Sequence, residues 1–315
     1  MTDSSKIPEG FIDLVKIILE QDRFSHEDSP ETIDEIWKEM VWLLFLSGSR
    51  SDASVNYICG LLDDNDFIDY DKLSEFESND WEDWKKEIVT FLFKKVNELD
   101  SKKKSGILKM LLQEINRDDV QNPLFYIQSA MRYFKEENVT RDSIERRTIN
   151  EQETGRLILE MYYSGESLEN EKKITGVAAS KAILFLHSFG KAMNEAPPTK
   201  HVKNFINYDI YKREYGKQEE NDETIMLEIK DYVKKYIKPM IKDVTVRDVE
   251  RAVWLWKSTQ SLLTDFGRGE KKKLTPQKFV GFIKKYSLEY VKDKLTDIDE
   301  QPELAQEVKD FLDSD

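Results

Sequence analysis

Apolar residues recur along most of the chain at the three- and four-residue spacing of an amphipathic helix. The first clear example runs from Phe11 to Leu19, where the apolar residues share one face. Ser29 and Pro30 carry the signals of a helix start, an N-cap followed by proline at the first helical position. They open a strongly apolar run through residues 36–46, which predicts a buried central helix.

The same periodicity continues to residue 292, and the alternation typical of strands is almost absent. Further helices are expected at roughly 52–62, 81–99, 101–115, 123–137, 151–163, 180–193, 200–213, 222–242, 246–264 and 275–292. The tail after Thr296 predicts a short acidic helix or a frayed end. Only 12 Gly and 8 Pro are available for the many tight turns that an all-β chain needs. The pattern therefore predicts a compact all-α fold.

The formal net charge of −14 is unevenly distributed over the 315 residues. Residues 1–84 carry 22 acidic against 6 basic side chains, and residues 293–315 carry 9 against 2. The middle of the chain, residues 85–292, therefore has a net charge of +9. The overall negative field disfavours non-specific binding to nucleic acid, because it repels phosphates. The basic middle leaves room for a local nucleic-acid-binding face, although ordinary solvated helix surfaces explain the same totals equally well.

Residue usage also excludes several kinds of site. The single Cys59 excludes an intrachain disulfide and a cysteine-based zinc or iron–sulfur site, and His26, His187 and His201 lack metal-ligand spacing. We therefore expect no metal and no cofactor. No apolar run reaches the roughly 18 residues of a membrane span, and the first residues do not resemble a signal peptide. The expectation is a soluble protein of the cytoplasm with no membrane partner.

One segment has the features of a ligand-binding turn. The small residues Gly176–Ala179 lead directly into an apolar helix that begins near Ser180. Small residues let a ligand approach the backbone closely, and the free N–H groups of a turn and a helix start can bind an anion such as a nucleic-acid phosphate. A plain connection between two helices is the alternative interpretation.

A second helix start follows further along the chain. The sequence Ala196-Pro-Pro-Thr-Lys-His-Val-Lys203 gives a rigid lead-in to a helix whose first turn holds Lys200, His201 and Lys203. Two helix starts with basic side chains could thus face one anion-binding site.

Four segments, taken in their order along the chain, carry a resemblance to a known family. They are Leu44-Phe-Leu-Ser-Gly-Ser-Arg-Ser-Asp-Ala53, Tyr70-Asp-Lys-Leu73, Ile174-Thr-Gly-Val-Ala-Ala-Ser-Lys-Ala182 and Pro198-Thr-Lys-His-Val202. This order resembles the helix-hairpin-helix DNA glycosylase superfamily, which includes endonuclease III and the 8-oxoguanine glycosylases. In that family a Leu-Ser-Gln-type turn comes first, the hairpin is often written Leu-Pro-Gly-Val-Gly-Arg-Lys-Thr-Ala, and Val-Asp-Thr-His-Val follows. The resemblance spans roughly residues 11–265.

The resemblance implies both a fold and an activity. The fold would have two helical lobes, residues 1–30 plus 175–292 and residues 31–174, followed by an acidic tail at 293–315. The activity would be a DNA N-glycosylase of base-excision repair, which flips a nucleotide out of duplex DNA and cuts its glycosidic bond. We expect a monomer that binds damaged or abasic duplex DNA and is therefore associated with the nucleoid. The DNA-binding residues would be Gly176, Val177, Ala178, Ala179, Ser180, Lys200, His201 and Lys203.

The resemblance also implies a catalytic amine. In bifunctional members of the family a lysine at the start of the second hairpin helix attacks the sugar and forms a Schiff base, which adds AP-lyase activity. Lys181 is the candidate, because the apolar residues 183–185 could desolvate its ammonium and lower its pKa. Matching the motif on Gly176 puts the family lysine at Ser180, whereas matching on His201 puts it at Lys181. A solvated first-turn lysine is the alternative interpretation of Lys181.

The chain departs from the family at the position of the catalytic Asp, where Thr199 stands. The family Asp stabilises the positive charge that develops on the sugar, and a neutral hydroxyl does not supply that stabilisation. Ala178 likewise replaces the second hairpin glycine. Glu195 and Asp209 are the nearest acids in sequence, so either the acid comes from elsewhere or the protein binds nucleic acid without cutting it. A non-catalytic, acidic, all-helical adaptor for protein partners is the competing hypothesis.

Overall fold

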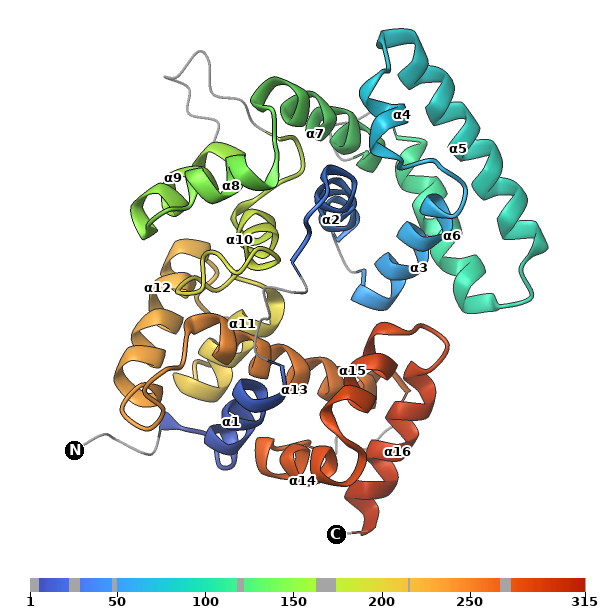
Figure 1. The fold of residues 1–315 in the computed structure, drawn as a ribbon. Helices are drawn as coiled ribbons and strands as arrows, with labels where there is room; N and C mark the ends of the chain where they lie inside the picture. Colours follow the sequence, from blue (N-terminus) through green and yellow to red (C-terminus); the bar gives the residue numbers. More distant parts are fainter. Residues whose placement is uncertain are drawn as a thin grey trace. The chain divides into compact units, whose positions relative to one another are not determined.

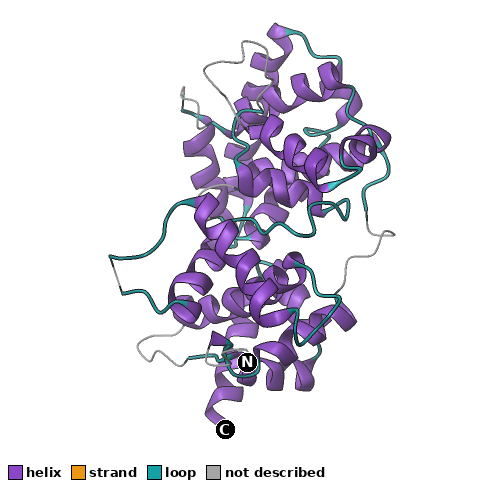
Figure 2. Cartoon of the chain, turned by 90° about the vertical axis from the view of Figure 1, so that its left-hand side faces the viewer, coloured by secondary structure: helices purple, strands orange, loops and turns teal. Residues whose placement is uncertain are grey.

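The computed structural model of the protein describes residues 6–22, 29–46, 50–117, 122–162, 174–214, 216–266 and 273–314. Throughout these ranges the regular elements are helices joined by loops, and no strand occurs among them (Figure 2). The predicted all-α fold is therefore confirmed. None of the described helices is both long enough and apolar enough to cross a membrane.

The chain divides into two compact units. Unit 1 combines Met1–Ser25 with Ala192–Asp315, and unit 2 consists of His26–Lys191. The sequence suggested boundaries at residues 30 and 174, but the second boundary lies at 191. The second boundary lies later in the chain because α10 (Ala179–His187) packs against α9 (Glu151–Tyr162) and α2 (Ile33–Phe45). The turn at Gly176 therefore belongs to unit 2.

Unit 2 is built around α2, the predicted central helix, whose apolar residues 36–45 are mostly buried. Between α2 and α9 the chain forms α3 (Asp52–Asp63), α4 (Tyr70–Ser74), α5 (Ser78–Glu98), α6 (Lys102–Ile115), α7 (Pro123–Glu137) and α8 (Arg141–Arg147) (Figure 1). Four helices, α3, α4, α7 and α10, pack directly against α2. The indole N–H of Trp37 on α2 donates to the carbonyl of Ile68 at 2.9 Å, which fixes the loop before α4 to the core.

Helix α2 begins later than the sequence suggested. Its N-cap is Thr32, not Ser29, because Thr32 and Glu35 form a reciprocal capping box. The Thr32 hydroxyl accepts from the backbone N–H of Glu35 at 3.2 Å, and the Glu35 carboxylate accepts from the N–H of Thr32 at 3.0 Å. The hydrogen bonds that the Glu35 carboxylate accepts from the backbone N–H groups of Thr32 and Glu31 lower the pKa of this carboxyl group. The two hydrogen bonds of this capping box stabilise a helix start at Thr32 more than the pattern at Ser29 and Pro30 would.

Unit 1 starts with α1 (Phe11–Gln21) and resumes after residue 191. Its further elements are α11 (Lys200–Asn204), η3 (Phe205–Ile210), α12 (Asp222–Tyr232), η4 (Val233–Ile237), α13 (Val246–Phe266), α14 (Pro276–Tyr286), α15 (Leu288–Thr296) and α16 (Gln301–Ser314). The segments η3 and η4 are π-helical turns that continue α11 and α12. Helix α13 is the centre of the unit, since α1, α11, α15 and α16 all pack against it.

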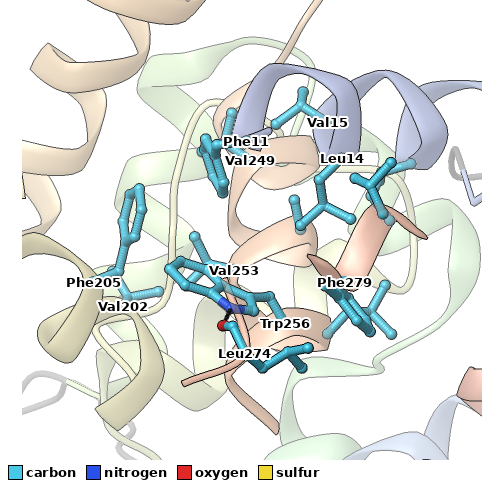
Figure 3. Close-up of a cluster of buried hydrophobic side chains, with 14 of the residues drawn as sticks. Phe11, Leu14, Val15, Val202, Phe205, Val249, Val253, Trp256, Leu274 and Phe279 are labelled. Carbon is cyan, nitrogen blue, oxygen red and sulfur yellow. Dashed lines mark hydrogen bonds between the residues drawn. The ribbon is translucent and has the colours of Figure 1, made fainter. Parts of the chain in front are cut away.

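The core of unit 1 joins the first helix to the last third of the chain, and Figure 3 shows its centre. The ring of Phe11 on α1 stacks on Phe205 at 5.0 Å between centroids, and both rings lie against Trp256 of α13. The indole N–H of Trp256 donates to the carbonyl of Leu274 at 2.6 Å. At the end of α1, the largely buried Asp22 carboxylate pairs with Arg251 and Lys292.

Three further differences from the sequence prediction have local causes. The expected helix at 275–292 is broken at Ser287, whose φ of +82° cannot continue a helix and whose hydroxyl caps α15. The tail expected as short or frayed forms the 14-residue helix α16, because Leu304, Val308 and Leu312 give it an apolar face that is buried in the core of unit 1. The short helices α4 and α8 were not predicted, since five and seven residues show too little periodicity.

Candidate functional site

The predicted site residues divide between the two units, Gly176–Lys181 in unit 2 and Thr199–Lys203 in unit 1. In unit 2 the helices α9 and α10 pack against each other, and the turn at residues 174–178 together with the start of α10 is called the hairpin below. The backbone N–H of Ile174 donates to the carbonyl of Met161 in the last turn of α9 at 3.2 Å, so the turn begins at the end of that helix. The N–H of Val177 then closes the turn on the carbonyl of Ile174 at 3.1 Å.

Glycine is required at position 176 for two independent reasons. Its φ is +83°, in the left-handed region that side chains disfavour. A Cβ atom there would lie 2.4 Å from the ring of Tyr126 on α7, which covers the glycine. The neighbouring N–H of Thr175 donates to the hydroxyl of Ser129, also on α7, at 3.0 Å. The turn is therefore held in one conformation by α7, a contact that the sequence did not predict.

The start of α10 has backbone donors that no side chain satisfies. Its N-cap residue is Ala178, which has no capping hydroxyl or carboxylate. Within the described residues the N–H groups of Ala178, Ala179 and Ser180 donate to no acceptor, and Ala178 is exposed. Such donors carry the positive end of the helix dipole and suit an anion. Val177, also predicted to bind DNA, is buried and has already used its N–H.

Lys181, in the first turn of α10, directs its amine toward the C-terminal end of α2. The Nζ atom donates to the carbonyl of Leu44 at 3.2 Å and lies 5.6 Å from the centre of the Tyr126 ring. Burial, together with the nearby guanidinium of Arg50, lowers the pKa of Lys181 to about 8. No carboxylate within the described ranges pairs with it. The lowered pKa agrees with the expected desolvation of this amine.

Arg50 occupies the same end of α2. Its guanidinium donates to the carbonyl of Phe45 at 2.7 Å and pairs with Glu114 of α6. Two segments that carry the family resemblance, one ending α2 and one starting α10, are thus joined through Lys181 and Leu44. Ser47–Ser49, in the middle of the first segment, lie outside the described residues.

In unit 1, Thr199 has a structural role. It is the N-cap of α11, and its hydroxyl accepts from the backbone N–H of Val202 at 3.4 Å. The two acids nearest in sequence are also occupied, because Glu195 pairs with Lys230 and Asp209 with Lys257. The position of the family Asp therefore holds a helix cap rather than a charge.

His201 is largely buried against α13. Its Nε2 atom lies 3.4 Å from the hydroxyl of Ser258. Burial, followed by the charges of Lys200 and Lys257, lowers the pKa of His201 to about 4. The imidazole is therefore neutral at neutral pH and does not attract a phosphate by charge.

A polar cavity of about 340 Å³ lies beside the start of α11. It is lined by Pro198, Lys200, Lys203, Asn204, Asn207, Tyr208, Gln218 and Glu220. The ammonium of Lys203 pairs with Asp222 at 2.8 Å and donates to the carbonyl of Glu220 at 3.1 Å. Lys200 is exposed and has no partner among the described residues. Its ammonium can therefore pair with an anion without first breaking an ion pair.

A second cavity, of about 720 Å³, lies in unit 2 between α7 and the segment joining α4 to α5. Thr175 of the hairpin turn lines it, together with Trp81, Phe125 and Arg132. Sequence reasoning missed these residues. One sequence pattern could have indicated this cavity. Opposite the apolar face of α7, aromatic and polar residues recur at helical spacing, namely Phe125, Gln128, Ser129 and Arg132.

Comparison with family models, with curated proteins and with solved structures finds no match for this chain. The described residues contain no group of three or more His, Cys, Asp or Glu side chains that could hold a metal ion.

Proposed function

We propose that this chain is a DNA-binding protein of base-excision repair, of the helix-hairpin-helix type, and that it acts on abasic sites in duplex DNA. The observation that supports the proposal is the turn before α10, where the backbone N–H groups of Ala178, Ala179 and Ser180 donate to no acceptor within the described residues. Amide groups at a helix start bind a phosphate without reading the base, which suits a protein that holds a strand at a lesion of variable sequence.

Lys181 supports a chemical role beyond binding. At pH 7 a lysine with a pKa of about 8 is neutral in about a tenth of the molecules, compared with well under a hundredth for an ordinary lysine. The neutral amine uses its lone pair to attack C1′ of the ring-opened abasic sugar. Loss of water from the resulting carbinolamine leaves a Schiff base on Nζ. The hydrogen bond to Leu44 holds the amine in place but must break for this attack.

A second candidate function is DNA binding without any reaction on the base or the sugar. The observation that favours it is the role of Thr199 as a helix cap, with Glu195 and Asp209 each paired to a lysine. Hydrolysis of an intact glycosidic bond requires stabilisation of a developing cation, which none of these three side chains provides in this arrangement. The proposal therefore assigns to Lys181 the reaction with an existing abasic aldehyde, rather than the removal of a base.

Replacing Ala179 by proline tests the hairpin. Ala179 is the first residue of α10, where proline fits the backbone, and Ala178 before it is already extended, so Ala179→Pro removes one N–H without breaking the helix. We expect this variant to bind a short abasic duplex at low ionic strength about tenfold more weakly, as measured by fluorescence anisotropy. Ala179→Gly keeps the N–H and should bind like the unmodified protein. Equal affinities for all three proteins, or no DNA binding at all, would overturn the proposal.

Borohydride trapping tests the amine. Reduction of the Schiff base should yield a covalent adduct with abasic duplex DNA, formed faster at pH 8 than at pH 7. Lys181→Gln should lose this adduct at least a hundredfold, whereas Lys191→Gln, which alters a lysine paired with Glu145 in the same unit, should retain it. If DNA affinity persists without an adduct, the binding-only candidate stands and the lyase does not.

A further inference from the structure

The cavity of about 720 Å³ in unit 2 has the size of a small-ligand site. Its walls come from one face of α7 and from the chain between α4 and the start of α5. The lining residues are Leu73, Phe76, Glu77, Ser78, Trp81, Phe125, Gln128, Ser129, Met131, Arg132, Lys135, Glu136 and Thr175. Aromatic rings and hydrogen-bonding groups thus line the same space.

Trp81 supplies a hydrogen-bond donor that the protein leaves unused. Its side chain is only 6% exposed, yet its indole N–H has no acceptor within the described residues. Trp37, Trp84 and Trp256, which are also buried, each donate to a backbone carbonyl at 2.6–2.9 Å. The Trp81 N–H is not one of the buried polar atoms that lack a partner, so it is accessible and can donate to a ligand or to water in the cavity.

Helix α7 adds two polar side chains to the lining of the cavity. Gln128 and Arg132, one turn apart on α7, have no hydrogen-bond or ionic partner in the described part of the chain. Phe125, on the same face, is 38% exposed. The Nζ atom of Lys85 lies 4.0 Å from the centre of its ring. An aromatic surface, an amide, an indole donor and a guanidinium together match a nucleobase with its phosphate.

The cavity is continuous with the hairpin. Thr175 lines the cavity and immediately precedes Gly176, and its N–H is bound to Ser129, another lining residue. The start of α10 is therefore separated from a lining residue of the cavity by only three residues of chain, Gly176–Ala178. Lys181 does not line the cavity, so a base bound there is a neighbour of the sugar that Lys181 attacks.

We propose that this cavity receives an unpaired nucleobase next to the lesion, on the strand that the hairpin holds. The inference rests on the proposed function and narrows its substrate class to abasic sites beside an unpaired nucleotide, such as those in bulges and at forks. The base stacks against Phe125 and accepts from the indole N–H of Trp81 at its edge. Gln128 hydrogen-bonds the base edge, and Arg132 pairs with the adjoining phosphate.

The test compares two abasic duplexes that differ only in whether the neighbouring nucleotide has a partner base. We expect the unpaired form to bind about tenfold more tightly, because stacking on aromatic side chains contributes that much per base. Phe125→Ala alters an exposed side chain that contacts only the unpaired base, so it should remove this preference while keeping the affinity for the paired duplex. Leu159→Ala, at an exposed apolar residue of α9 that lines none of the described cavities, is the matched control and should keep it.

A second measurement follows the base directly. 2-Aminopurine at the unpaired position should become protected from acrylamide quenching in the unmodified protein and should lose that protection in Phe125→Ala. Paired and unpaired duplexes binding equally, with unchanged quenching, would overturn the cavity assignment and leave the proposed function standing. Absence of binding to both duplexes would overturn the proposed function and the assignment with it.

Discussion

The two halves of the predicted site contain the same kinds of residues but use them differently. In unit 2, three backbone donors at the start of α10 have no acceptor among the residues that the structure describes, and the amine of Lys181 in the same turn has a lowered pKa. In unit 1, the hydroxyl of Thr199 and the ammonium of Lys203 are occupied by contacts within their own unit.

This difference shows why a motif does not by itself establish a site. A threonine before a helix is a good cap, and a lysine near an aspartate forms an ion pair, whatever a family pattern implies. Alanines at a helix start cannot cap it with their side chains, so the N–H groups of Ala178, Ala179 and Ser180 have no acceptor within the described residues. The support for a ligand-binding role is therefore stronger for the site residues of unit 2 than for those of unit 1.

The largest effect is expected from Gly176→Ala. The added methyl group meets the ring of Tyr126, and the left-handed backbone is strained as well, so the free energy of unfolding should fall by about 2–4 kcal/mol. Gly155→Ala is the matched control, because Gly155 lies in α9 with nothing within 4 Å of the new methyl group. The free energy of unfolding of this variant should rise by up to about 1 kcal/mol. Urea unfolding of both variants measures the contrast. Equal stability of the two would mean that Tyr126 does not hold the turn.

Acid should destabilise the protein through His201. Its folded pKa of about 4 lies below the unfolded value of 6.5, so the folded state binds fewer protons and loses stability as pH falls from 6.5 toward 4. Between pH 7 and pH 5 the loss should be about 2 kcal/mol, which is an upper estimate for a partly exposed group. His201→Gln should remove this part of the pH dependence in denaturant titrations. A variant with the same acid sensitivity as the unmodified protein would contradict the assignment.

Lys181 should make stability depend on pH with the same sign as His201, but in the alkaline range. The folded pKa of Lys181, about 8, is below its unfolded value of 10.5, so the unfolded state binds more protons between these values and stability rises with pH. From pH 8 to pH 9.5 the gain should be about 1.5 kcal/mol at most, relative to Lys181→Met. Denaturant titrations at the two pH values measure it. A parallel pH dependence in both proteins would indicate that the amine is solvated.

The smallest effects on DNA binding are expected from Lys200 and Lys203, and the two lysines should differ. Lys200 is unpaired within the described residues, so Lys200→Ala should weaken DNA binding a few-fold and lower the slope of log affinity against log salt by about 1. Lys203 is already neutralised by Asp222, and Lys203→Ala should leave that slope nearly unchanged. Anisotropy titrations at several salt concentrations give both slopes. Identical slopes for the two variants would show that pairing with Asp222 does not matter.

Much of the fold could be predicted because helix periodicity is a local property. The central helix α2 and most of the longer helices followed from it, whereas the break at Ser287 depends on a single backbone angle that periodicity does not record. Within the site, the turn at Gly176 was visible as a run of small residues. The contacts of Tyr126 with Gly176 and of Lys181 with Leu44 join segments far apart in sequence, and no local pattern predicts them. The cavity beside Trp81 was missed for the same reason.

The discontinuity of unit 1 also affects how the protein is made. On the ribosome, α1 emerges with Phe11, Leu14 and Ile18 facing water, since the residues that cover them follow position 191. At ordinary rates of translation that delay is on the order of ten seconds. Unit 2 can fold during this interval, while the first helix stays exposed to chaperones and to aggregation until its partners are synthesised.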